Sequence, residues 1–161
     1  MWQNLVDVLG KISLVYDQLA KLGEKKRDAL VTIDMEGLSK ILDEEQLLAA
    51  KIQKLEKQRG SILQEIAKTD NRINEQTKAE DIYRAAPSLS MEKRLLSLHK
   101  TLGRSVDRAL KIRDNNQLLA RGALDAVQTH LNRLSGAAVE PTYGSKGDDV
   151  VTHKKKLDFK A

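Results

Sequence analysis

The residues best suited to acid–base or metal chemistry in this chain are three histidines, and they lie far apart in the sequence. Two of them, His99 and His130, fall on apolar series that repeat every seven residues, and His153 lies near the end of the chain. A lone histidine on such a series is usually a packing residue with one ring nitrogen hydrogen-bonded. The spacing therefore predicts no histidine-based catalytic or metal site.

The other reactive residue types also lack the spacing that catalysis or cofactor binding needs. Glu44-Glu45 and Asp148-Asp149 are adjacent pairs, whereas di-metal helical bundles need inward glutamates and Glu-x-x-His repeats. The nine glycines are scattered singly and none precedes a Lys-Ser/Thr pair as in a phosphate-binding loop. The serines lack a nucleophile elbow. The absence of cysteine rules out disulfides and cysteine-based zinc sites. We expect no enzyme and no cofactor.

Size and composition indicate one helical domain with a modest core. The chain has 161 residues, of which 40% are hydrophobic. No stretch approaches the roughly 20 apolar residues of a transmembrane helix. The first residues lack a basic leader, and Asp7 interrupts any apolar core of a signal peptide. We therefore expect a cytoplasmic protein without direct membrane insertion. The few aromatic residues favour helices over sheets; they are Trp2, Tyr16, Tyr83, Tyr143 and Phe159.

Charge is distributed unevenly along the chain, whose net charge is +5. Residues 34–67 carry five Lys/Arg against seven Asp/Glu, and residues 88–136 carry nine against four. An acidic segment and a basic one in the same chain are what packing partners would show. Nucleic-acid binding would need basic residues interleaved with stacking aromatics, and residues 88–136 contain none. We therefore expect no nucleic-acid partner.

The longest helical signal covers residues 88–136, and it follows Pro87 and ends at Ser135-Gly136. Apolar residues repeat there every seven positions, from Leu95 and Leu96 onward, and a helix of this length is roughly 70 Å long. A first helix is predicted at about 2–31, with a bend or pause expected where Gly23 precedes a charged run.

A second helix is predicted at about 34–67, beginning at Asp34. Its heptad series consists of Ile41, Leu48, Leu55 and Ile62, which favours coiled-coil packing. Two charged residues, Glu45 and Arg59, interrupt the neighbouring series. Either they set the register of packing, or they lie at the helix edge with their charged heads in water; the second interpretation is favoured.

Residues 68–87 connect the second and third helices. Poor helix formers and Pro87 interrupt the periodicity there. We predict a short helical turn between Lys78 and Ala86, with Tyr83 packed on the end of the bundle. The fold class is therefore all-α: an elongated antiparallel three-helix bundle or coiled coil. The helical domain covers 1–136, with helices at about 2–31, 34–67 and 88–135, and a flexible basic tail covers 137–161.

The lengths of the helices point to a binding surface. The second helix spans roughly 50 Å, so a neighbour of roughly 70 Å overhangs it. Because residues 67 and 88 lie close together, the overhang falls at residues 118–134. An apolar stripe left at a bundle end marks a binding surface, here of the helix-in-groove kind. The predicted client-binding residues are Leu118, Leu119, Ala120, Ala123, Leu124, Val127, Leu131 and Leu134.

Several short patterns resemble those of one family. They are Asp34-Met-Glu-Gly-Leu38, Leu55-Glu56-x-x-Arg59-x-x-Ile62-Leu63, Asn116-x-Leu118-Leu119, Tyr143-Gly144-x-x-Gly147 and the terminal Leu157-Asp-Phe-Lys-Ala161. With them the chain resembles the FlgN-like flagellar export chaperones, which guard the hook–filament junction proteins. The resemblance covers nearly the whole chain.

The resemblance implies a function and partners. Members of this family bind the C-terminal helices of hook-associated proteins in the cytoplasm. They prevent premature assembly of these clients and deliver them to the membrane protein of the flagellar type III export gate. The family's client surface maps here onto residues 118–134, and its gate-docking tyrosine maps onto Tyr143. The export ATPase complex is a further candidate partner.

A structural role is the alternative to a chaperone role. In that case the chain is a coiled-coil assembly protein that self-associates through the same apolar stripe. A homodimer of the client-free form is compatible with both interpretations.

Overall fold

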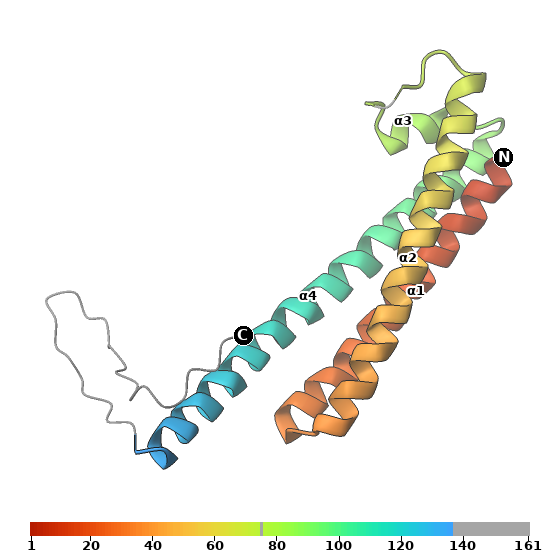
Figure 1. The fold of residues 1–161 in the computed structure, drawn as a ribbon. Helices are drawn as coiled ribbons and strands as arrows, with labels where there is room; N and C mark the ends of the chain where they lie inside the picture. The colour runs from red at the N-terminus through yellow and green to blue at the C-terminus, as the bar shows by residue number, and fades with distance from the viewer. Residues whose placement is uncertain (75, 137–161) are drawn as a thin grey trace, which may run out of the picture. The chain divides into compact units, whose positions relative to one another are not determined.

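The structure is a computed structural model that describes residues 1–74 and 76–136, and these form four α-helices without a strand among them (Figure 1). The helices are α1 (Trp2–Thr32), α2 (Met35–Thr69), α3 (Ala79–Arg84) and α4 (Leu89–Leu134). The predicted all-α class is confirmed, and the predicted ends of the long helices agree within two residues. Residues 1–117 form one compact unit, and a second unit begins at Leu118. The predicted tail, 137–161, lies outside the described residues.

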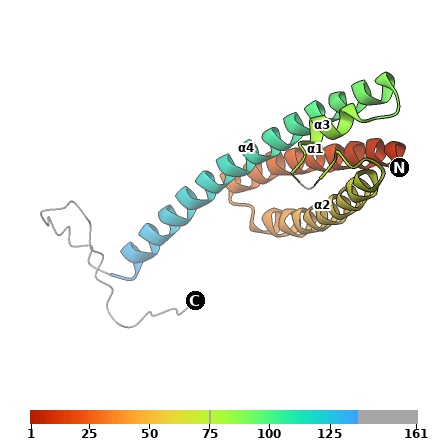
Figure 2. The same ribbon diagram turned by 90° about the horizontal axis from the view of Figure 1, so that it is seen from above.

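A tight turn joins α1 to α2. Ile33 adopts a left-handed conformation (φ 54°), so that the Ile33 and Asp34 amides donate to the carbonyls of Leu30 and Ala29. A β-branched residue rarely adopts this conformation. The Asp34 side chain then accepts a hydrogen bond from the Gly37 amide at 2.9 Å, which confirms Asp34 as the cap of α2. The turn reverses the chain, and α1 and α2 lie side by side and antiparallel (Figures 1 and 2).

The main core of the first unit is built on one face of α1. Each large aliphatic side chain removed from water there contributes about 1.5–3 kcal/mol. Helices α2, α3 and α4 each add residues to this core, at positions that the heptad pattern predicts for α2 and α4. The members with the least exposure are Leu5, Leu9, Ile12, Val15, Ile66, Tyr83 and Leu95.

Helix α4 runs parallel to α1 within the first unit. The Ser13 and Ser105 hydroxyls lie 3.1 Å apart, and Nδ2 of Asn116 donates to the Gly23 carbonyl at 2.7 Å. Residue numbers rise together along both helices, which fixes the parallel direction. Figure 2 shows α1 between α2 and the part of α4 that belongs to this unit.

Gly23 is not the weak point that the sequence suggested, because α1 continues unbroken to Thr32. A Cβ atom at Gly23 would lie 2.6 Å from Cγ2 of Ile112, closer than real Cβ contacts. The prediction of a pause in the helix was therefore wrong. The missing side chain instead lets α4 approach α1 and lets Asn116 reach a main-chain carbonyl.

Among the described residues, two ion pairs join different helices, and both involve α1. Lys26 of α1 contacts Glu45 of α2 at 2.7 Å, and Arg108 of α4 contacts Glu24 of α1 at 2.8 Å. Within the described residues no ion pair joins α2 to α4, so the predicted pairing of the acidic and basic segments is not observed. The physical reason is that α1 lies between α2 and this part of α4 (Figure 2), so that one charged residue of each helix pairs with α1 instead.

The two polar heptad residues behave differently. The Glu45 side chain is only 28% exposed and joins α2 to α1 through Lys26, as a register contact would. Arg59 pairs with Glu56 one turn away on the same helix. The edge interpretation, which the sequence favoured for both, therefore does not describe Glu45, whereas the ion pair of Arg59 stays within α2.

The short helix α3 confirms the helical turn predicted in the connection. Its Tyr83 is 2% exposed, and the hydroxyl lies 3.3 Å from Nδ1 of His99 on α4. The two rings meet edge to face, with centroids 5.6 Å apart. Burial raises the pKa of the Tyr83 hydroxyl above its ordinary value of about 10. His99 is thus a packing residue with one bonded nitrogen, as predicted.

Candidate functional site

The helical part of the second unit, residues 118–134, carries large apolar side chains that remain exposed. Leu124 is 68% exposed and Leu134 71%, while Val127 and Leu131 are about half exposed. Ala120 is exposed and Ala123 is partly buried. By contrast, all the buried apolar side chains among the described residues belong to the first unit. The helix therefore presents an uncovered apolar surface here.

Helical geometry gathers most of these side chains into one stripe. At about 100° of rotation per residue, six predicted site residues fall within an arc of about 100°. They span about 21 Å along the helix axis. We call this set the α4 stripe; its members are Ala120, Ala123, Leu124, Val127, Leu131 and Leu134.

The other two predicted residues lie outside this arc. Leu119 flanks the stripe beside Ala123, and its side chain is 38% exposed. Leu118 is 67% exposed but lies about 120° around the helix from Leu124. One flat helical surface therefore cannot contact both Leu118 and Leu124.

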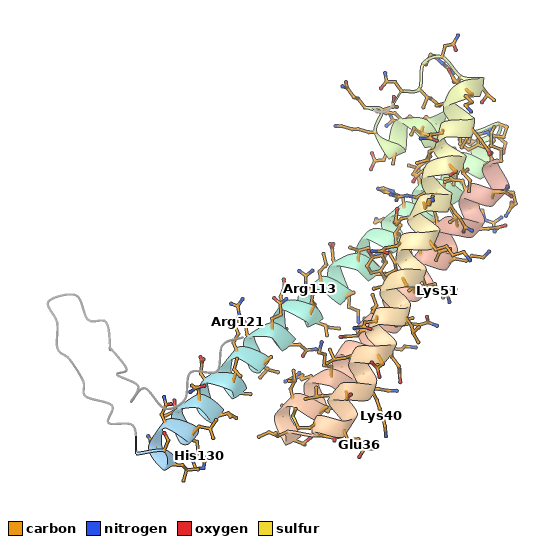
Figure 3. All side chains as sticks on the ribbon, viewed as in Figure 1. Glu36, Lys40, Lys51, Arg113, Arg121 and His130 are labelled. Atoms are coloured by element: carbon orange, nitrogen blue, oxygen red, sulfur yellow. The ribbon has the colours of Figure 1, made fainter. Side chains whose placement is uncertain are left out.

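Polar residues border the α4 stripe without entering it. The helical spacing places Arg121 and Gln128 along one edge of the stripe. Nε2 of Gln128 donates a hydrogen bond to Oδ1 of Asn132 at 3.1 Å. His130 lies near the other edge and is exposed, so it is not the packing residue that its heptad position suggested. Figure 3 shows both Arg121 and His130 projecting from α4. An uncharged stripe with polar edges fits the apolar face of an amphipathic helix.

No metal site and no membrane span is found in the part of the chain that the structure describes. Its His, Asp and Glu side chains form no group of three that could hold a metal ion. None of its helices is long and apolar enough to cross a membrane. The predicted docking residue Tyr143 lies outside the described residues.

Comparison with known protein families identifies the chain. A family model described as FlgN protein matches residues 1–150. The chain belongs to the FlgN family. This is a family of flagellar export chaperones, so the resemblance read from the sequence is confirmed. No curated protein and no solved structure matches the chain. The FlgN match includes both the core unit and the α4 stripe.

Proposed function

We propose that this FlgN-family chain is a cytoplasmic export chaperone for hook-associated proteins of the hook–filament junction. It binds the C-terminal helical region of its client, prevents premature assembly, and delivers the client to the flagellar export gate. No chemical step is involved. The client's amphipathic helix is held by apolar contact with the α4 stripe and is released when that contact weakens.

The exposed α4 stripe is the observation that carries this proposal. Its four large side chains are between 48% and 71% exposed, although they follow the same helical spacing as the buried residues of α4. Covering them with a client helix removes apolar surface from water, at about 25 cal/mol per Å². Ala120 and Ala123 have small side chains and keep the N-terminal end of the stripe shallow, so a client backbone can approach closely there.

The test compares substitutions on two sides of the same helix. Leu124→Asp places a carboxylate in the stripe and should weaken binding of a hook-associated C-terminal peptide by about a hundredfold or more. Leu118→Asp is the matched control, since Leu118 is equally exposed but faces away from the stripe. Leu118→Asp should weaken binding of the same peptide by less than about threefold, as measured by isothermal titration calorimetry. Equal losses in the two variants would refute the assignment of the stripe.

Self-association through the same stripe is the rival function. A structural coiled-coil protein should form a tight dimer that Leu131→Asp dissolves, and it should ignore client peptides. Sedimentation velocity with and without the peptide separates the two cases. A client-free dimer that the peptide converts to a 1:1 complex supports the chaperone, whereas a dimer that persists supports assembly.

Delivery is proposed to use a separate contact through Tyr143, with the export gate protein as partner and the ATPase complex as a further candidate. This part rests on the family resemblance. Tyr143→Ala should leave peptide affinity unchanged and reduce export of the client in cells. A parallel loss of affinity and export would contradict the division into two sites.

A further inference from the structure

The small and large residues of the α4 stripe are spaced symmetrically about Val127. Ala120 and Leu134 lie seven residues before and after it. Ala123 and Leu131 lie four residues before and after it. Each of these alanines therefore has a leucine at the same distance on the other side of Val127. If the helix is turned end over end about Val127, the leucines come to the heights of the alanines.

This symmetry makes the stripe complementary to a second copy of itself. When two α4 helices meet antiparallel with a two-fold axis at Val127, each residue lies opposite the residue at the same distance beyond Val127. Leu134 of the second copy then lies over Ala120, at about 10 Å from the axis, and Leu131 of the second copy lies over Ala123, at about 6 Å. Large side chains thus fill the space beside small ones, as in a well-packed interface.

The charges beside the α4 stripe do not oppose this pairing. Arg121 and Arg133 flank the stripe on opposite edges, each about 120° around the helix from Val127. The two-fold axis sets each edge against the same edge of the second copy, so the two Arg121 side chains start about 18 Å apart along the helices. Gln128 lies near the axis, where its amide can hydrogen-bond to the same amide of the second copy.

We propose that two client-free copies pair antiparallel through the α4 stripe, with Val127 on the two-fold axis. The occupant is a second copy because the stripe is complementary to itself, as an interface between identical subunits requires. The pairing does not depend on the proposed function, whereas its role in covering the client site rests on that function.

The pair should be weak and should yield to a client. The stripe is about 21 Å long on a helix about 10 Å wide, so two stripes bury less than the roughly 1,200 Å² of stable interfaces. The second copy keeps the exposed leucines from non-specific contacts, and a client helix that binds them more tightly displaces it. A structural assembly protein would instead remain a tight dimer in the presence of client peptide.

The first test uses single cysteines in the full chain, which has no cysteine of its own. Val127→Cys should give a disulfide-linked dimer on mild oxidation, because two Cα atoms beside the axis come within the roughly 7 Å that a disulfide spans. Leu118→Cys is the control, since Leu118 is 67% exposed but lies about 180° around the helix from Val127. Non-reducing gels should show about tenfold more dimer for Val127→Cys.

Two further cysteines test the direction of the pair. Ala123→Cys alone and Leu131→Cys alone should link poorly, because equivalent residues are about 12 Å apart along antiparallel helices. A mixture of these two variants should link about as well as Val127→Cys. Equal linking of all three single variants would indicate a parallel pair and would overturn the proposal. A Val127→Cys yield no higher than that of Leu118→Cys would also overturn it.

The C-terminal peptide of a hook-associated protein then tests whether the pair covers the client site. The peptide should lower the yield of linked Val127→Cys dimer as it saturates the chain. A peptide that binds without lowering this yield would refute the covering of the site. If the peptide binds and no cysteine links, the pairing is refuted and the proposed function stands. If the cysteines link and the peptide does not bind, the pairing is supported and the proposed function fails.

Discussion

At the scale of single residues, Gly23 and Asn116 determine how closely α4 packs on α1. Asn116 is 5% exposed and donates to Gly23, but its Oδ1 atom has no hydrogen-bond partner among the described residues. A buried polar residue on an apolar seam typically specifies register at a cost in stability. The parallel register of α1 and α4 therefore depends on a main-chain carbonyl that only a glycine leaves accessible.

Gly23→Ala should test this close approach. The added methyl would overlap Cγ2 of Ile112, whose β-branched side chain has one preferred rotamer in a helix. Overpacking costs about 1–3 kcal/mol, which exceeds the helix-propensity gain of about 1 kcal/mol. We expect a lower free energy of unfolding in urea.

Gly60→Ala is the control for this substitution, since a Cβ atom at Gly60 would have no other atom within 4 Å. It should raise the free energy of unfolding by about 0.5–1 kcal/mol through helix propensity alone. If both substitutions stabilise the protein equally, α1 and α4 are further apart than the structure places them.

At the scale of elements, α3 shows how a short segment is ordered by packing. A helix of six residues is not stable by itself in water. Its order depends on Ile82 and Tyr83, which are 6% and 2% exposed in the main core. The contact of Tyr83 with His99 then joins the connection to α4.

This contact predicts a dependence of stability on alkaline pH. Burial raises the pKa of Tyr83, so the folded state keeps the neutral phenol while the unfolded state ionises near pH 10. This contribution to stability is therefore complete below about pH 10 and is lost as the pH rises towards the folded pKa. Tyr83→Phe removes this pH-dependent contribution. Above about pH 10, the free energy of unfolding of the variant should therefore fall less steeply than that of the wild type.

The comparison at neutral pH is the control for Tyr83→Phe. There the variant should lose no more than about 1 kcal/mol, the value of one hydrogen bond. Lysine ionisation affects both proteins alike above pH 10, so the difference between their slopes isolates Tyr83. Identical slopes would show that the hydroxyl is accessible to solvent.

At the scale of the whole molecule, the core and the proposed client-binding surface occupy different stretches of the chain. The buried apolar residues lie between Leu5 and Leu102, and the α4 stripe begins at Ala120. The first unit contains the main core. The stripe contributes no buried side chain, so its apolar character is not needed for the core.

A fragment of residues 1–117 should therefore fold. We expect helical circular dichroism and a urea midpoint close to that of the full chain, together with complete loss of client-peptide binding. A fragment that unfolds without cooperativity would show that residues beyond 117 stabilise the core.

The sequence by itself determined the helices and the exposed stripe. Heptad spacing and end signals such as Asp34 are local, so they identified each helix and its apolar face without knowledge of the partner helix. The chain's resemblance to FlgN proteins was also readable from short patterns. The predicted pause at Gly23 is absent, because the role of this glycine depends on an atom of another helix that approaches it.

Only the tertiary structure decided which surfaces meet. It placed α1 between α2 and the first part of α4. Glu24 and Lys26 of α1 therefore pair with Arg108 of α4 and Glu45 of α2, whereas the sequence suggested that the basic and acidic segments pair with each other. It also showed that Gly23 of α1 lies against Ile112 of α4. Periodicity determines which face of a helix is apolar, but contacts between helices depend on packing across the whole chain.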